Sequence, residues 1–242
     1  RDSDTAVELV ELGMPQDLLA SYENVVTQPH GMVLITGPTG SGKTTTLYAT
    51  LEKISNEKQK IITVEDPVEY QLDGITQIQA NASIGLGFAE GLRSIVRQDP
   101  DILMIGEIRD HETAEIAIES ALTGHLVFST LHTNDAAGAV PRLQDMGVEG
   151  YLISSSLLAI QAQRLVRRVC IECAETHPLS LDEARVLDID SAECIEIRRG
   201  KGCERCGQTG YRGRVRLYEL LLMSDAIRHQ IASGADANST RD

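Results

Sequence analysis

The 242-residue sequence predicts an α/β fold with a mostly parallel sheet, followed by a small annex that contains four cysteines. Short apolar runs alternate along the chain with longer segments of helical periodicity, and these runs are apolar on both faces. Near residue 164 this pattern breaks, and paired cysteines take the place of apolar periodicity. We therefore expect a core over 1–163, an annex over 164–216 and a C-terminal helical piece over 217–242, cut from a longer chain.

The elements can be placed in order along the chain. Residues 1–30 predict one helix or two that lead into the first strand. Short aliphatic runs predict strands at 32–36, 61–65, 101–105 and 125–130. Helical periodicity predicts helices at about 43–56, 87–97, 112–122, 134–146, 150–163 and 180–187. Strands separated in this way by helices imply a parallel sheet that is covered on both sides.

The composition excludes some classes of protein. With 42% hydrophobic residues the chain can bury a substantial core. It has no apolar run long enough for a membrane span and no signal-peptide layout at its start, so we expect a soluble, intracellular protein. The net charge of -14 would repel a nucleic-acid backbone, so we expect no nucleic-acid partner.

Residues 37–44 have the sequence GPTGSGKT, which matches the GxxxxGK[ST] pattern between a predicted strand and a predicted helix. In such a loop the glycines let consecutive backbone amides point at a phosphate, and the helix N-terminus adds partial positive charge. Lys43 would reach the β- and γ-phosphates, and the Thr44 hydroxyl would bind Mg²⁺. The candidate nucleotide-binding residues are Gly37, Pro38, Thr39, Gly40, Ser41, Gly42, Lys43, Thr44 and Thr45. The motif alone does not separate ATP from GTP, although the lack of an NKxD sequence weakens the GTPase interpretation.

Side chains suited to phosphoryl transfer flank three further predicted strands. Glu65 ends the second strand, Glu107 follows the third, and His125 and His132 lie on either side of the fourth. Ligands of an open parallel sheet bind outside the carboxyl ends of its strands, so we expect these groups to gather beside the phosphate loop. Glu107 would contact Mg²⁺ through water, and Glu107 or Glu65 would orient the attacking water. An ion pair with Arg109 is the structural alternative for Glu107.

Two histidines and two arginines keep alternatives open. Each histidine either has a structural role or senses the nucleotide by a hydrogen bond to its phosphate. Arg93 and Arg97 lie one helical turn apart, so both can project the same way. Either arginine meets a phosphate, in its own subunit or in a neighbouring one, or pairs with nearby acids such as Asp99 and Asp101.

Cys170 and Cys173 form one CxxC pair, and Cys203 and Cys206 form a second. Four thiolates in two such pairs suit a tetrahedral Zn²⁺ with every position filled, which is a structural site. Disulfides are a poor alternative inside the cell, and a redox pair is a further one. Because the annex has little core of its own, the metal would staple it and supply much of its folding energy. We expect Cys194, the fifth cysteine, to act as a small apolar residue.

Four segments, in this order, resemble the signature boxes of the secretion ATPase superfamily that drives type II secretion and type IV pilus machines: GPTGSGKTTTLY, ITVEDPVEY, RQDPDILMIGEIRD and TGHLVFSTLHTNDA. The resemblance implies a RecA-like phosphate-loop NTPase core. It assigns the Walker A box to residues 37–44. The other boxes fall on Glu65 and Asp66 (aspartate box), Gly106 and Glu107 (Walker B) and His125 and His132 (histidine box). A glycine in place of the usual Walker B aspartate is itself a trait of this family.

The second part of the chain extends the resemblance. AQRLVRRVCIEC and the second CxxC pair are similar to the assembly branch of the superfamily, which carries a zinc-binding insertion. Arg93 and Arg97 match arginines that complete the nucleotide site in the secretion branch.

The family implies Mg-dependent ATP hydrolysis by a homohexamer. This hexamer works on the cytoplasmic face of the bacterial inner membrane, with platform and docking proteins of the machine as partners. Family members place a further N-terminal domain before this core, so we expect an isolated core to bind ATP but to hydrolyse it slowly as a monomer.

Two other functions stay open at this point. One is a nucleic-acid translocase with a related hexameric core, against which the acidic balance and the lack of an aromatic stripe argue. The other is a nucleotide-binding regulatory module with little turnover, against which the two carboxylates Glu65 and Glu107 argue.

Overall fold

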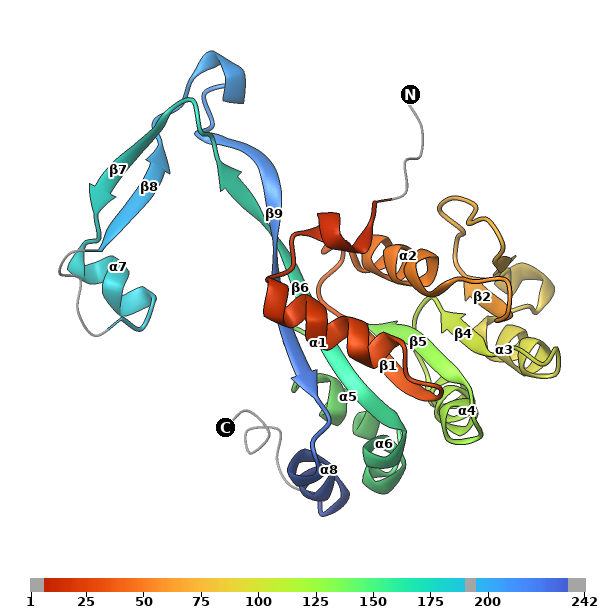
Figure 1. The fold of residues 1–242 in the computed structure, drawn as a ribbon. Helices are drawn as coiled ribbons and strands as arrows, with labels where there is room; N and C mark the ends of the chain where they lie inside the picture. The colour runs from red at the N-terminus through yellow and green to blue at the C-terminus, as the bar shows by residue number, and fades with distance from the viewer. Residues whose placement is uncertain (1–6, 190–194, 235–242) are drawn as a thin grey trace. The chain divides into compact units, whose positions relative to one another are not determined.

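The computed structural model describes residues 7–189 and 195–234, which form two compact units (Figure 1). The first unit takes in the described residues up to Arg164 and those from Arg216 onward, and the second is Leu165–Val215. Cys194 lies outside the described residues. No helix in the described ranges combines the length and the hydropathy that a membrane crossing requires.

A sheet of seven strands among the described residues organises the first unit, in the order β3-β2-β4-β5-β1-β6-β9. The strands are β1 (Gly31–Thr36), β2 (Ile61–Glu65), β3 (Thr76–Gln79), β4 (Ile102–Ile105), β5 (Leu126–Leu131), β6 (Leu157–Val169) and β9 (Tyr211–Leu222). The pairs from β3 across to β6 are all parallel. β9 runs opposite to β6, because Met223 N–H donates to Leu158 O and Cys170 N–H donates to Gly210 O. The predicted α/β fold with a mostly parallel sheet is confirmed.

Helices cover both faces of this sheet, which its doubly apolar strands require (Figure 1). Val33 and Ile35 of β1 face one layer, and Leu34 faces the other, as the two-residue period of a strand dictates. The first layer contains η1 (Leu9–Leu12), α1 (Gln16–Val26) and α2 (Lys43–Ile54). The second contains α3 (Phe88–Val96), α4 (His111–Leu122), α5 (Ala139–Asp145), α6 (Gly150–Ser156) and α8 (Asp225–Ala232).

Two predicted helical segments are wrong in part. The helix expected over 150–163 ends at Ser156, and β6 begins at Leu157. The C-terminal piece expected to be helical from 217 continues β9 as far as Leu222 before α8 begins. In both cases an apolar run was open to either structure, because periodicity alone does not separate a buried strand from a buried helix.

The second unit is built on a small antiparallel pair, β7 (Ala174–Pro178) with β8 (Glu196–Gly200). It also contains α7 (Leu181–Val186) and the 3-10 turn η3 (Glu204–Cys206). Among its described residues the buried apolar side chains are Cys170, Cys173, Leu179 and Ala184. So few buried residues leave the unit with little hydrophobic stabilisation, as the sequence predicts.

Candidate nucleotide-binding site and four-cysteine cluster

The loop over residues 37–44 leaves β1 and enters α2 at Lys43. Gly37, Gly40 and Gly42 have φ angles of 146°, 76° and 89°, which favour glycine. At Gly37 a side chain would also collide with the carbonyl oxygen of Gln163. Lys43 Nζ donates to Gly37 O at 2.8 Å and to Pro38 O at 3.3 Å, so it lies folded back across the loop. Such a curled backbone at a helix N-terminus has the shape and polarity to hold a phosphate.

Glu107 follows β4 at the edge of the sheet where β1 also ends. Its Oε1 accepts from Arg109 Nη2, and its Oε2 lies 3.3 Å from His132 Nε2. The hydrogen bond from Arg109 holds the pKa of Glu107 below its ordinary value, and His132 acts in the same direction while partial burial opposes them. Burial lowers the pKa of Lys43, and the charge of Glu107 opposes that shift. Lys43, Glu107 and His132 are thus within electrostatic reach at one edge of the sheet.

Glu65 ends β2 at the same edge but is enclosed. Its carboxylate accepts from Tyr48 Oη of α2, from Thr63 Oγ1 and, at 3.0 Å, from Gln77 Nε2. Burial, followed by the hydrogen bond to Glu65, raises the pKa of Tyr48 well above its usual range. A carboxylate with three donors in a buried place is held rigidly, whereas Glu107 is the more accessible of the two.

His125 does not lie beside the phosphate loop, so that expectation is wrong. It precedes β5, and Gly31 N–H at the start of β1 donates to His125 O at 3.0 Å. Its ring Nδ1 lies 2.9 Å from Ser120 O. The residue begins its strand rather than ending it, which places it at the amino edge of the sheet. His132 follows β5 and lies at the carboxyl edge, as expected.

Neither predicted arginine pairs with Asp99 or Asp101 in the described part of the chain. Arg93, on α3, pairs with Glu112 and lies 3.3 Å from Glu90. Arg97 ends α3 and makes no side-chain hydrogen bond or ion pair with the described residues.

Gln163 of β6 supports the phosphate loop and was missed at the sequence level. It is buried; its Nε2 donates to Ser41 O, and its Oε1 accepts from Thr46 Oγ1, both at 2.9 Å. Gln161 Nε2 also donates to this oxygen at 3.1 Å. The signal was present in the sequence, because glutamines two residues apart inside the apolar run LLAIQAQRL would share one face of a strand.

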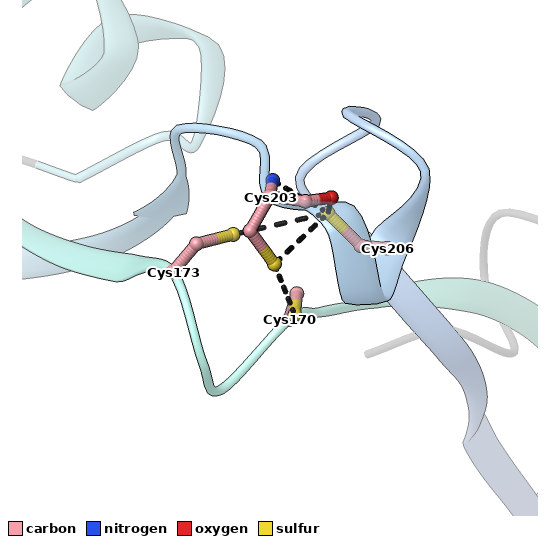
Figure 2. Close-up of side chains that lie close together, drawn as sticks. All are labelled: Cys170, Cys173, Cys203 and Cys206. Carbon is pink, nitrogen blue, oxygen red and sulfur yellow. Dashed lines mark hydrogen bonds between the residues drawn. The ribbon is translucent and has the colours of Figure 1, made fainter.

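The four predicted cysteine ligands come together in the second unit (Figure 2). Their sulfurs lie within 4.8 Å of one another, with pairs at 3.9, 3.9 and 3.7 Å. A tetrahedral zinc ion with Zn–S bonds of about 2.3 Å separates its sulfurs by about 3.8 Å, so the cluster fits this ion.

The surroundings of Cys206 favour a thiolate. The N–H groups of Cys203 and Gly210 donate to Cys206 Sγ at 3.2 and 3.3 Å. Burial raises the pKa of this thiol, but these hydrogen bonds outweigh it and lower the pKa to about 6. A thiol that ionises readily is suited to binding a metal ion.

Comparison with known proteins places the chain in a family. The family described as "Type II/IV secretion system protein" matches residues 1–242. The chain belongs to this family. Protein E of the type II secretion system of Klebsiella pneumoniae is 53% identical over 228 residues, which are 94% of this chain and 46% of that protein. The type II secretion system ATPase E of Vibrio cholerae is 50% identical over 231 residues, 96% of this chain and 46% of that protein. The chain thus spans about half the length of these relatives.

Solved structures agree with the fold. The pilus retraction motor PilT, determined with bound ADP, superimposes with a TM-score of 0.69 at 31% identity, over 97% of this chain and 58% of that one. The ATPase DotB of Legionella pneumophila has a TM-score of 0.66 at 27% identity, over 96% of this chain and 55% of that one. The resemblance to secretion ATPases drawn from the sequence motifs is therefore confirmed.

Proposed function

We propose that the chain is the motor part of a Mg-dependent ATPase that powers type II secretion or type IV pilus assembly. One observation carries the proposal: the curled phosphate loop brings Lys43 within electrostatic reach of Glu107, at the edge of the sheet where β1 and β4 both end. The relatives named as type II secretion ATPases support ATP as the nucleotide and transport as the purpose.

Each residue of the proposed site has a task that its surroundings favour. The loop amides of residues 37–45 hold the phosphates, and Lys43 exchanges its bonds to Gly37 O and Pro38 O for phosphate oxygens. Glu107 is ionised at neutral pH, because its pKa is lowered, and it orients the attacking water. His132, 3.3 Å from Glu107, is placed to sense the γ-phosphate. Glu65 fixes Tyr48 and thereby supports the helix that follows the loop.

The oxygens of this site fit magnesium. The exposed Thr44 hydroxyl at the start of α2 and the Glu107 carboxylate are hard ligands, and Glu107 would act through water. Bound Mg²⁺ would neutralise charge on the phosphate oxygens.

The remaining predicted residues fall outside this constellation. In the proposed assembly, a homohexamer on the cytoplasmic face of the inner membrane, the partly exposed Arg93 and the Arg97 beside it complete a nucleotide site from α3. His125 has a structural role, because it bonds the C-terminal part of α4. The inner-membrane platform and docking proteins of the machine are the partners. Zn²⁺ in the four-cysteine cluster is structural, because four thiolates leave no open position.

Glu107→Gln tests the proposal in the full-length protein. We expect ATP turnover to fall by about 100-fold or more, because the amide cannot accept a proton from water, while ADP binding is kept. Glu119→Gln, an exposed carboxylate on α4, is the matched control and should hydrolyse ATP normally. Lys43→Ala should abolish nucleotide binding. Turnover near wild type in Glu107→Gln would remove this residue from the mechanism.

A further inference from the structure

Arg216 of β9 brings a guanidinium against the phosphate loop from a strand distant in sequence. A Cβ built on Gly42 would lie 3.4 Å from Arg216 Nε and 3.8 Å from Arg216 Nη2. The Gln163 Nε2 that supports the loop at Ser41 would lie 3.4 Å from the same point. Arg216 therefore borders the loop at the residue immediately before Lys43.

This guanidinium lacks an acceptor in the part of the chain that the structure describes. Its Nε is buried and donates no hydrogen bond there, and none of the ion pairs among these residues includes Arg216. Tyr218, two residues further along β9, uses its hydroxyl to donate to Leu12 O at 3.0 Å. A buried cationic donor without a partner destabilises the fold by about 1–3 kcal/mol, so an anion at this place would remove a real cost.

The neighbouring loop is the part of the molecule shaped to hold an anion, with its three glycines in left-handed φ and its helix N-terminus. Arginine presents its N–H groups as a planar fork that can bond two phosphate oxygens at once. Both its Nε and an Nη group lie beside Gly42, which is the edge of the fork used for such bidentate bonding.

We propose that Arg216 is a further nucleotide-binding residue, which donates hydrogen bonds to a phosphate of a bound nucleoside di- or triphosphate on the Gly42 side of the loop. The inference rests on the proposed function, since it requires a nucleotide in the loop. Positive charge then reaches the phosphates from two elements, Lys43 from α2 and Arg216 from β9.

Arg216→Met tests the inference, because methionine keeps much of the apolar stem and removes the charge and the donors. We expect the Kd for ADP to rise about tenfold or more, as for the loss of a charge-assisted hydrogen bond, and its dependence on salt concentration to weaken. The Tm without nucleotide should stay the same or rise, because the unpaired buried donor is gone. If Arg216 only packs against Gly42, the Tm should instead fall and the salt dependence should stay that of the wild type.

Two further variants separate this inference from the proposed function. Arg212→Met removes the same charge from an exposed position of the same strand and should bind ADP normally. If Lys43→Met binds ADP as the wild type does, the proposed function is wrong. If Lys43→Met loses ADP binding while Arg216→Met keeps the wild-type Kd and salt dependence, only the role of Arg216 is overturned. Should Arg216→Met fail to fold, Arg216→Gln decides the same comparison by its Kd and salt dependence.

Discussion

Two carboxylates at one edge of the sheet differ in what surrounds them, and this difference favours different tasks. Glu65 is buried and accepts from three side chains, so it could take a proton from water only after losing one of these partners. Glu107 is held by Arg109 and His132 at a partly open place. The sequence left the choice between them open; their surroundings favour Glu107 as the group that orients water.

Arg109 makes the stability of the protein depend on pH through Glu107. Because the folded-state pKa of Glu107 is lowered, its stabilisation is complete above the unfolded pKa of about 4.3 and is lost as pH falls through the folded value. Arg109→Met should therefore lower stability at pH 7, by no more than about 1 kcal/mol since Arg109 is largely exposed. Below about pH 4 the two proteins should converge. Urea unfolding at pH 7 and pH 3.5 checks this, and an equal difference at both pH values would contradict it.

Gln163 should matter more to the phosphate loop than its distance in sequence suggests. Gln163→Leu leaves Ser41 O and Thr46 Oγ1 without this partner in a buried place, so we expect a stability loss of about 2–3 kcal/mol and weaker ADP binding. Gln161→Leu is the matched control, because Gln161 Oε1 already has no partner and the change should cost less. Urea unfolding and ADP titration measure both effects, and equal losses in the two variants would count against the role of Gln163.

At the scale of elements, the sequence predicts a strand well when turns or helices isolate it. The runs that became β1, β2, β4 and β5 are short, aliphatic and separated by helical segments, and the structure confirms all four. β6 follows α6 directly, with the helix C-cap at the first residue of the strand, so no glycine or proline marks the change. Tertiary pairing with β1 decides the strand, and a single sequence does not show that pairing.

The same limit explains which parts of the candidate site could be predicted. Lys43 and Glu107 sit in local motifs whose geometry follows from strand, loop and helix in sequence order. Gln163 and Arg216 approach the loop from β6 and β9, so only the sheet order brings them there. His125 was misplaced because a residue next to a strand can lie at either edge, and the edge depends on whether it precedes or follows the strand.

At the scale of the whole molecule, the chemistry is divided between the two compact units. The phosphate loop, Glu107 and Arg216 belong to the first, and the four cysteines belong to the second. The first has a sheet with a helix layer on each face, whereas the second has few buried apolar side chains. A ligand of either unit should therefore stabilise mainly the unit that binds it.

Metal removal and nucleotide addition should consequently act on different stretches of chain. After verified removal of Zn²⁺ by a chelator, we expect proteases to cleave within 165–215, because the unit loses the metal that supplies much of its folding energy. The affinity for ADP should change little. Saturating ADP, at about 100 times its Kd, should protect the first unit by about 2.7 kcal/mol and leave cleavage within 165–215 unchanged. Limited proteolysis with mass spectrometry reads both responses, and Cys206→Ser should reproduce the chelated pattern without chelator. A second unit that stays resistant after its metal is gone would show that the cysteine cluster does not hold it together.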